Sequence, residues 1–483
     1  MNVNLSASRE PAPLSSFAKL SFYPWLVVCI TCIGAFIGQL DASIVQLALP
    51  ALERNFHATL ASVSWVAIAY LLAYAATLPV FARMSEMFGR KLLYIAGYAL
   101  FTGASLLCGL VFDVRLLIIF RLLQGIGGGM LGANSLTILA KAAGPHRRGR
   151  AMGLFAAAQA VGVSAGPVVG GLLLSTLGWR WVFWVSVPFG LAGILFGWLV
   201  LPQTESASDK RFDWWGAVLL TPALASIVIL LSEFQTWKPG LTAFVALLSI
   251  ILLACFAWRE LRQTSPLIDL KLFGVPAFFG GVIGVNLSYA LLYAMFFLMS
   301  FAFVRGFGDS AISAGVHLAI IPITLGLIAP ISGKLYERFG PRLLTTAGMI
   351  FCGGAIVMLS RSLSGMQHDI VGMAALGMFG VGLGIYIAPN NAATIAAAPA
   401  GRTGEAGGML NLMRVLGCMV GIVTASTALA WRLQARTGFG DRTLGVPAQA
   451  VVGAVHEVLW ILLFFSIVAG GAALFRPPPD DGL

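Results

Sequence analysis

The stretch RRGRAMGLFAAAQAVGVSAGPVVGG, residues 147–171, indicates how this chain folds. Its apolar part places a glycine at every fourth position, with a proline and one more glycine between them: Gly162, Gly166, Pro167, Gly170 and Gly171. On a helix, glycines four residues apart share one face, so a neighbouring backbone can lie against them, as helices do in lipid. The proline removes a backbone donor and bends the helix. The stretch therefore predicts a closely packed, kinked helix where two parts of a membrane protein pivot.

A copy of this stretch lies further along the chain. Six residues that begin at Arg147 recur 255 positions later, where Gly404 corresponds to Gly149. A loop around Gly89 recurs around Gly340, at the similar offset of 251. Self-similarity at one offset indicates two structurally equivalent halves. Parallel halves of membrane proteins enclose a substrate site near the middle of the bilayer.

The composition excludes a water-soluble protein. Hydrophobic residues make up 59% of the chain, charged residues make up 10%, and the mean hydropathy is +0.90, whereas soluble domains carry about 25% charged residues. Apolar runs of about 20 residues, long enough to cross a bilayer, repeat from end to end. We count fourteen, which begin near Phe22, Leu60, Lys91, Arg115, Gly149, Trp181, Trp214, Leu241, Ala277, Ile312, Pro341, Ile370, Thr403 and Val451.

These observations predict an all-α membrane protein with two pseudo-symmetric six-helix bundles and two inserted helices, fourteen transmembrane helices in all. The clearest break in composition, LPQTESASDKRFD, begins at Leu201. The expected parts are a cytoplasmic tail (1–20), an N-terminal six-helix bundle (21–202), a cytoplasmic linker (203–212), the two inserted helices (213–260), a second cytoplasmic linker (261–276), a C-terminal six-helix bundle (277–475) and a cytoplasmic tail (476–483).

The positions of Lys and Arg predict the orientation. With the N-terminus inside, the inner loops hold 19 of these residues and the outer loops hold 9, so the positive-inside rule places both termini in the cytoplasm. The net charge of +11 follows from this orientation, and we expect no nucleic-acid partner. The first apolar run is too long for a cleavable signal peptide. We therefore expect a multi-pass protein of the cell (inner) membrane.

The sequence favours neither a metal site nor enzyme chemistry. Cys29 and Cys32 form a CxxC pair inside a predicted span, without a second pair or a histidine nearby, so packing is preferred over a metal or redox site. No GxxxxGK[ST] loop supports ATP hydrolysis. GVSAG, residues 162–166, fits the GxSxG motif of hydrolases, but it lies in a helical glycine ladder and lacks a strand-to-turn context and a positioned histidine. An intramembrane hydrolase is a remote alternative, and we expect no cofactor.

Two charged residues are expected inside predicted spans. Asp41, in GQLDASIVQLALP, is the one acidic residue placed within a span rather than at its rim. A charge there costs about 2.5–3.5 kcal/mol or more, so this carboxylate is a candidate proton carrier. The alternative is a helix-end carboxylate that reaches the outer surface. Arg121, with Gln124 one turn later, needs hydrogen-bond partners in lipid, and a functional role is preferred over a structural one.

Seven residues are candidates for lining a substrate cavity: Gln46, Gln124, Asn286, Tyr289, Tyr293, His317 and Arg414. Asn286, Tyr289 and Tyr293 share one polar and aromatic face of a predicted helix, as in the wall of a roomy cavity, and the alternative is packing. His317 is either a titrating side chain or one hydrogen-bonded to a backbone carbonyl. Arg414 occupies the position that matches Gln159 in the first half.

The duplicated loops are candidates for gating. ARMSEMFGRKLLYI contains Glu86, Gly89 and Arg90, and its copy GKLYERFGPRLLTT contains Glu337 and Gly340. Glycine permits a tight turn, and a glutamate beside Arg or Lys can pair with a neighbouring helix end and latch one conformation. The alternative, that the loops are basic only because they lie inside, explains their charge but not the duplicated spacing.

Together these residues resemble the major facilitator superfamily, and within it the fourteen-helix drug:proton antiporter branch, over nearly the whole chain. LDASIVQLALP is similar to the helix 1 signature, in which the aspartate is associated with proton coupling, and Asp41 matches it. RLLQGIGGG matches the helix 4 motif, in which the arginine is linked to proton transfer, and Arg121 matches it. GVSAGPVVGG matches the antiporter motif of helix 5. The resemblance implies the major-facilitator fold.

The chain departs from the patterns of that branch at several positions. In ARMSEMFGRK, Ala82 replaces the leading glycine and Glu86 replaces an aspartate, whereas the second-half copy keeps Gly333. Ser186 replaces the usual asparagine in WRWVFWVSVPFG. Gln46 replaces the usual asparagine of helix 1, which implies an altered substrate preference.

The resemblance implies a multidrug efflux transporter: a proton-coupled antiporter that exports hydrophobic or cationic toxic compounds, such as antibiotics, as its two halves rock around a central cavity. Its partners would be small hydrophobic molecules, protons and the lipid bilayer, and the proton gradient would supply the energy. Whether a periplasmic adaptor takes part stays open. The alternatives are a dedicated exporter of one metabolite, lipid or siderophore, and an uptake symporter.

Overall fold

The computed structural model describes residues 10–204, 213–233, 237–263, 266–364, 370–399, 401–439 and 442–475, and these residues form helices joined by loops. The elements are α1 (Ser15–Ala18), α2 (Tyr23–Phe56), α3 (Leu60–Phe88), α4 (Lys91–Leu110), α5 (Val114–Thr176), α6 (Arg180–Trp184), α7 (Val187–Val200), α8 (Trp214–Glu233), α9 (Pro239–Arg262), η1 (Leu270–Gly274), α10 (Pro276–Phe301), η2 (Ala302–Gly306), α11 (Ala311–Ser364), α12 (Ile370–Ala396), α13 (Thr403–Thr437), α14 (Ala448–Ala472) and η3 (Ala473–Phe475). The expectation of an all-α chain is confirmed for this part of the sequence.

Twelve helices among the described residues are long and apolar enough to cross a membrane, so the expected count of fourteen is not confirmed. The difference arises because two pairs of expected helices form continuous elements, α5 with 63 residues and α11 with 54. Each element contains a kink where two helices join, at Gly144 (φ 68°, ψ 173°) and at Gly340 (φ 71°, ψ 171°). Glycine suits both places, because a side chain there would be strained at positive φ. Pro145 and Pro341 follow and suit the first turn of the next helix.

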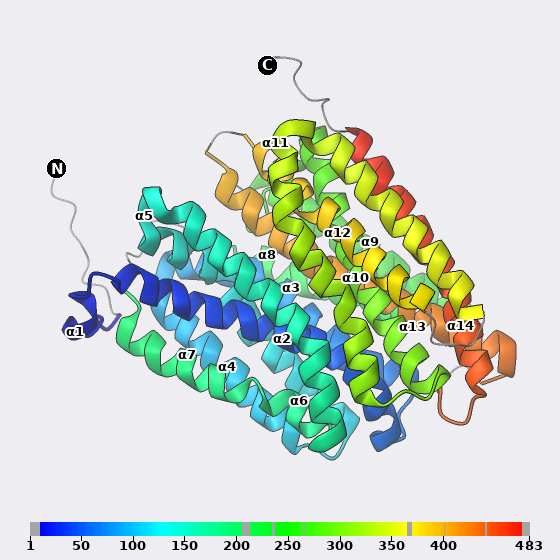
Figure 1. Ribbon diagram of the computed structural model, residues 1–483. Coiled ribbons are helices and arrows are strands. Elements are labelled where there is room, and N and C mark those ends of the chain that lie inside the picture. Colours follow the sequence, from blue (N-terminus) through cyan, green and yellow to red (C-terminus); the bar gives the residue numbers. More distant parts are fainter. Residues whose placement is uncertain are drawn as a thin grey trace.

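Each half of the chain packs mainly on itself. In the N-terminal half, α5 packs against α2, α3 and α4, and α7 packs against α4. In the C-terminal half, α11 packs against α12 and α14, and α10 packs against α13. Contacts between the halves join α5 to α11, α3 to α13 and α2 to α10. Figure 1 shows the two groups of helices diverging towards the side of the molecule where both chain ends lie.

The glycines that follow the kink of α5 face two neighbours. A Cβ atom on Gly162 would lie 2.6 Å from the Phe36 carbonyl oxygen, so this face of α5 lies directly against the backbone of α2. Gly171 faces α11 in the other half, where a Cβ atom would lie 2.5 Å from the Ala311 carbonyl oxygen. The second-half copy repeats the first arrangement, since Gly417 of α13 lies against α10 in the same way.

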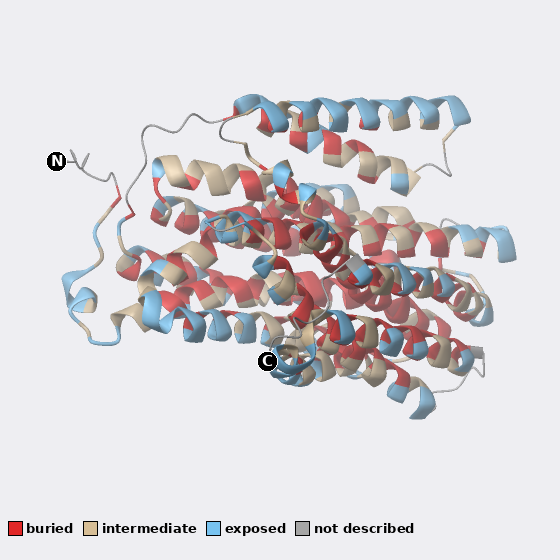
Figure 2. Ribbon diagram, turned by 90° about the horizontal axis from the view of Figure 1, so that it is seen from above, coloured by how far each residue is buried: buried red, intermediate tan, exposed pale blue. Residues whose placement is uncertain are grey.

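The helices between the two halves lie at the periphery. α8 packs against α9, and also against α3 of one half and α13 of the other. Thr427 Oγ1 of α13 donates a hydrogen bond to the Leu231 carbonyl of α8 at 3.1 Å. Few residues of α9 are buried, namely Ser249, Phe256 and Glu260. Figure 2 shows the buried residues concentrated within the helical assembly and the exposed residues along its edges.

Within the expected cytoplasmic tail (residues 1–20), Glu10 packs against the N-terminal bundle. The Glu10 side chain accepts hydrogen bonds from the Lys91 backbone N–H at 2.9 Å and from the N–H and hydroxyl of Thr204, each at 2.7 Å. This carboxylate caps the N-terminal end of α4, where it also complements the helix dipole. The expected linker residues 205–212 and tail residues 476–483 lie outside the described part.

Candidate functional site

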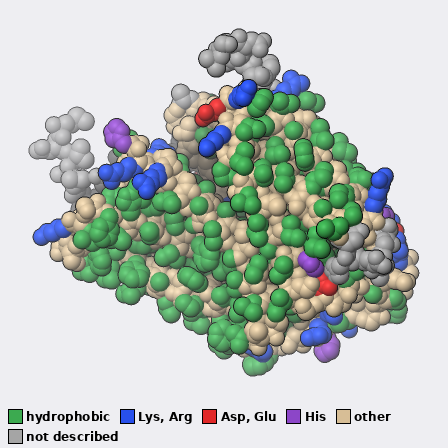
Figure 3. Space-filling view, viewed as in Figure 1, with side chains coloured by type: hydrophobic (Ala, Val, Ile, Leu, Met, Phe, Trp, Pro, Cys, Tyr) green, Lys and Arg blue, Asp and Glu red, His purple; other side chains and the backbone are tan. Residues whose placement is uncertain are grey.

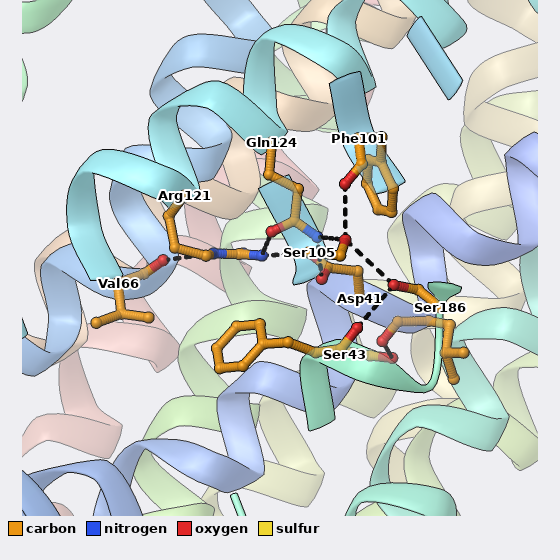
Figure 4. Close-up of polar contacts among 10 residues, drawn as sticks. Asp41, Ser43, Val66, Phe101, Ser105, Arg121, Gln124 and Ser186 are labelled. Carbon is orange, nitrogen blue, oxygen red and sulfur yellow. Dashed lines mark hydrogen bonds and ion pairs between the residues drawn. The ribbon is translucent and has the colours of Figure 1, made fainter. Parts of the chain in front are cut away.

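The two predicted intramembrane charges form one buried ion pair. Arg121 Nη1 donates to Asp41 Oδ2 at 2.6 Å, and the exposed fractions of the two side chains are 0% and 1%. Asp41 lies within the length of α2 rather than near its end, because that helix continues to Phe56. The carboxylate therefore does not reach the outer surface, which was the alternative considered from the sequence. Figure 4 shows Asp41 and Arg121 with Gln124, Ser105 and Val66 around them.

Neighbouring helices hold the pair in place. Gln124 Nε2 donates to Asp41 Oδ1 and to Ser105 Oγ of α4, both at 2.8 Å. Arg121 Nε donates to the Val66 carbonyl of α3 at 2.9 Å. The carboxylate thus receives a hydrogen bond on each of its oxygens, and α2, α3, α4 and α5 meet through one polar network.

Stability alone does not account for this network. Removing two charges from water costs several kcal/mol, and a buried ion pair is often no more stabilising than apolar residues of the same volume. One atom of the guanidinium group, Arg121 Nη2, is buried without a hydrogen-bond partner in the described part of the chain. Protonation of Asp41 would remove its negative charge and weaken its attraction for Arg121. The arrangement can therefore translate the gain or loss of a proton into a change of contact between α2 and α5.

A cavity of about 360 Å³ lies between the two halves, beside this network. Tyr289, Tyr293 and Arg414 line it from the C-terminal half, as expected from the sequence. Figure 3 shows the surface hollowed between the two groups of helices on the side of the chain ends. The other predicted cavity residues are not among those that line it: Gln46, Gln124, Asn286 and His317.

Those four residues have other surroundings. Gln124 belongs to the Asp41 network, and Gln46 is 2% exposed on α2. Asn286 Nδ2 donates to the Met413 carbonyl at 3.3 Å, which ties α10 to α13. His317 Nδ1 lies 3.6 Å from Asp309 Oδ2 near the start of α11.

Tyr70 contacts both the ion pair and the cavity. Asp41 does not line the cavity, but Gly38 and Ala42 on the same helix do. Tyr70 of α3 also lines it, and its ring centroid lies 4.4 Å from Arg121 Cζ. The ion pair thus lies next to the cavity wall without being part of it.

Sequence reasoning missed several cavity residues. Tyr70 and Tyr74 of α3, Gln159 of α5 and Asn411 of α13 all line the cavity. The two tyrosines lie four residues apart, the same spacing as Tyr289 and Tyr293, and this repeated pattern was the available signal.

The duplicated loops adopt similar backbone turns but make different contacts. Gly89 has φ 98° and Gly340 has φ 71°, so both copies use a conformation that favours glycine. Glu86 Oε2 accepts from Arg83 Nη1 at 2.7 Å. Burial lowers the pKa of the Arg90 guanidinium, and the Glu86 charge acts in the opposite direction.

The second loop lacks a matching pair in the described residues. Glu337 is exposed there and forms no ion pair with another described side chain. No atom outside the local helix lies within 4 Å of a Cβ placed on Gly333. The Arg83–Glu86 pair lies within the single helix α3, so neither pair of helix ends is latched by a glutamate ion pair that the structure describes, and the gating role of the loops stays a prediction.

The halves are joined at the end of the molecule away from the chain ends. Glu53 of α2 is fully buried and accepts hydrogen bonds from the N–H of Thr443 at 2.6 Å and from its hydroxyl. Arg305 of η2 lies 3.7 Å from the same carboxylate and donates to the Pro50 carbonyl at 2.8 Å. Glu53 and Pro50 belong to the N-terminal half, and Thr443 and Arg305 belong to the C-terminal half. This polar cluster therefore closes that end.

Comparisons with known proteins agree with this architecture. Residues 31–422 match the sequence profile of the Major Facilitator Superfamily. The chain is 29% identical over 439 residues to the riboflavin transporter RibZ of Clostridioides difficile, covering 90% of this chain and 94% of that one. It is 31% identical over 420 residues to the tetracenomycin C resistance and export protein of Streptomyces glaucescens, with coverage of 85% and 77%. It is 30% identical over 416 residues to the drug efflux pump JefA of Mycobacterium tuberculosis, with coverage of 84% and 80%.

A solved structure supports the fold. A bacterial homolog of the human lysosomal transporter Spinster, in an inward-facing and unoccupied conformation, superposes with a TM-score of 0.68. The sequences are 15% identical, and the superposition covers 95% of this chain and 100% of that one. At this identity the likeness concerns the fold alone.

Proposed function

Because the chain belongs to the Major Facilitator Superfamily, and is a multi-pass membrane transporter rather than an enzyme, we propose that it is a proton-coupled antiporter that exports hydrophobic small molecules. Relatives named as drug efflux pumps and multidrug resistance proteins support the direction of transport. The proposed energy source is the proton gradient, without a cofactor.

The observation that carries the proposal is the placement of the Asp41–Arg121 pair. Asp41 is 2% exposed, its carboxylate is bound by Arg121 at 2.6 Å, and Tyr70, whose ring packs on Arg121, lines the cavity. A buried carboxylate beside a transport cavity is a natural proton site, because intramembrane charges are costly and are retained for function. In the conformation described, Arg121 and Gln124 each donate a hydrogen bond to Asp41, and we assign this conformation to the state after proton release.

The proposed topology accounts for the two kinked elements. We assign two membrane crossings each to α5 and α11, one on either side of Gly144 and Gly340, which gives fourteen crossings. With the basic loops inside, both termini lie in the cytoplasm, and the protein resides in the cell (inner) membrane. The cavity then opens to the cytoplasm, and the cluster around Glu53 closes the outer side. The structure corresponds to an inward-facing state that loads substrate.

A second function is transport of a single metabolite. The observation that favours it is the 29% identity to a riboflavin transporter over 90% of this chain. The two functions differ in their range of substrates, because a dedicated transporter confers no broad resistance.

Inside-out membrane vesicles test the proposal. Neutral Nile red, cationic ethidium and anionic fluorescein are offered to vesicles with an imposed proton gradient, with and without an uncoupler. We expect at least one dye to accumulate in vesicles that contain the protein, and accumulation to collapse with the uncoupler. Accumulation that survives the uncoupler contradicts proton coupling, and accumulation of none of the dyes contradicts broad export.

A further inference from the structure

We propose that the cavity selects aromatic acids: planar aromatic molecules that carry a carboxylate or another oxyanion, bound through Arg414. This inference rests on the proposed transport function and names the class of its substrate. It differs from the expectation of hydrophobic or cationic compounds that the sequence suggested. The charge that faces the cavity is positive, so it repels a cation.

Arg414 is the charged residue among those that line the cavity in the described structure, and no aspartate or glutamate lines it. The intramembrane carboxylate of Asp41 does not line the cavity, and its charge is balanced by Arg121 at 2.6 Å. The two charges of that pair largely cancel at the cavity. The field that a substrate meets is therefore dominated by one guanidinium group.

Arg414 has no acidic partner of its own in the described chain. Its Nη2 atom donates to the neutral Asn411 side chain at 2.6 Å, and it forms no ion pair with a described carboxylate. A guanidinium group at membrane depth is costly without a counter-charge. Its planar set of donors matches a carboxylate or phosphate in bidentate geometry. A bound oxyanion would supply the counter-charge.

The rest of the lining fits an aromatic ring. Tyr70 and Tyr74 line the cavity from one half, and Tyr289 and Tyr293 line it from the other. Tyr74, Tyr289 and Tyr293 also lie close enough to Arg414 to interact with it electrostatically. Tyrosine rings stack with an aromatic ligand, and their hydroxyl groups can donate to an oxyanion. The volume of about 360 Å³ falls at the small end of ligand pockets, which run from about 300 to 1,000 Å³.

A cluster of tyrosines could also form a cage for an organic cation, since ring faces attract positive charge. Arg414 decides between the two ligands. A fixed positive charge in the same cavity repels a cation and attracts an anion, and the low dielectric of the site strengthens both effects.

Binding to the purified, full-length protein tests the inference without a proton gradient. The probes are anthracene carboxylate, its neutral carboxamide and an anthracene trimethylammonium salt, which share one ring system and differ in charge. Naphthalene and pyrene analogues of each probe cover other ring sizes. The affinities are measured by calorimetry or fluorescence for the native protein, Arg414→Gln and Arg414→Lys. Arg342→Gln is the matched control, because Arg342 is exposed and does not line the cavity.

We expect the native protein to bind at least one carboxylate about tenfold or more tightly than its carboxamide, the factor that a charged hydrogen bond of about 1.5–3 kcal/mol supplies, and to bind the ammonium probe most weakly. Arg414→Gln should abolish the preference, Arg414→Lys should retain part of it, and Arg342→Gln should leave it unchanged. A preference for the ammonium probe, no binding of any carboxylate, or a preference that persists in Arg414→Gln overturns the inference. Selective binding without gradient-driven transport leaves this inference standing and contradicts the proposed function instead.

Discussion

Gly171 of α5 and Ala311 of α11 lie in direct backbone contact across the two halves of the protein, since a Cβ atom on Gly171 would come within 2.5 Å of the Ala311 carbonyl oxygen. On the facing helix, a Cβ atom on Gly315 would lie 2.2 Å from the Pro167 carbonyl oxygen. The stretch that bears the glycine ladder therefore closes the end of the molecule opposite the cavity mouth. A side chain at either glycine would force the halves apart there.

The first prediction concerns this contact. Gly171→Ala should shift the protein towards the outward-open state, because overpacking costs about 1–3 kcal/mol in the closed arrangement. Spin labels at Phe112→Cys and Phe439→Cys, exposed positions on the two halves, should show a longer distance in a background without other cysteines. Gly153→Ala is the control, because nothing lies within 4 Å of a Cβ atom at Gly153 on the same element. An unchanged distance between the spin labels in Gly171→Ala would show that this contact does not hold the two halves together.

The second prediction concerns the polar cluster at the same end. Glu53→Gln keeps an acceptor for Thr443 but removes the charge that faces Arg305, 3.7 Å away. A lost interaction with a charged group costs about 1.5–3 kcal/mol, so the spin-label distance distribution should again move to longer values. Glu457→Gln is the matched control, because Glu457 pairs with Arg432 and Arg436 inside one half. If both variants behave alike, the cluster does not hold the halves together.

The third prediction concerns the N-terminal segment. Glu10→Ala removes a carboxylate that accepts from Lys91 and Thr204 and caps α4. Loss of a cap costs about 0.5–2 kcal/mol, so the thermal midpoint of the purified protein should fall by a few degrees. Glu10→Gln should lie between the native protein and Glu10→Ala, since an amide retains one acceptor. Glu337→Ala is the control, an exposed glutamate at the copied loop, and an equal effect of Glu337→Ala would contradict the capping role.

Much of the architecture could be predicted from the sequence, because it depends on local patterns. The apolar runs began close to the starts of the observed helices, and the every-fourth-residue glycines indicated the close approach of α5 to α2. The structure contains fewer separate helices than the sequence predicted. The turns at Gly144 and Gly340 are so short that the two helices on either side of each turn form one continuous element. The role of Glu10 was missed, since its partner Thr204 lies 194 residues away and no local pattern links them.

The candidate site was predictable in part for the same reason. Asp41 and Arg121 stood out as charges inside apolar runs, but their pairing at 2.6 Å depends on how α2 and α5 pack. The sequence spacing places Asn286 on the same helix face as Tyr289, yet Asn286 contacts α13 instead of lining the cavity. The spacing of residues along one helix does not determine which neighbouring helix each of them contacts. The sequence also could not predict that Arg414 lines the cavity without an acidic residue beside it in the described structure. Which side chains surround Arg414 depends on how the helices assemble.

Proton-driven transport by Asp41→Asn in proteoliposomes tests the central claim most directly. Asparagine preserves the size of the side chain and its hydrogen bonding to Gln124, but it cannot lose a proton. We expect Asp41→Asn to bind substrate and to exchange it across the membrane without a gradient, while accumulation driven by a proton gradient falls to the background of empty liposomes. Asp113→Asn, at the exposed start of α5, should retain full gradient-driven accumulation. Undiminished, pH-dependent accumulation by Asp41→Asn would show that the proton binds elsewhere.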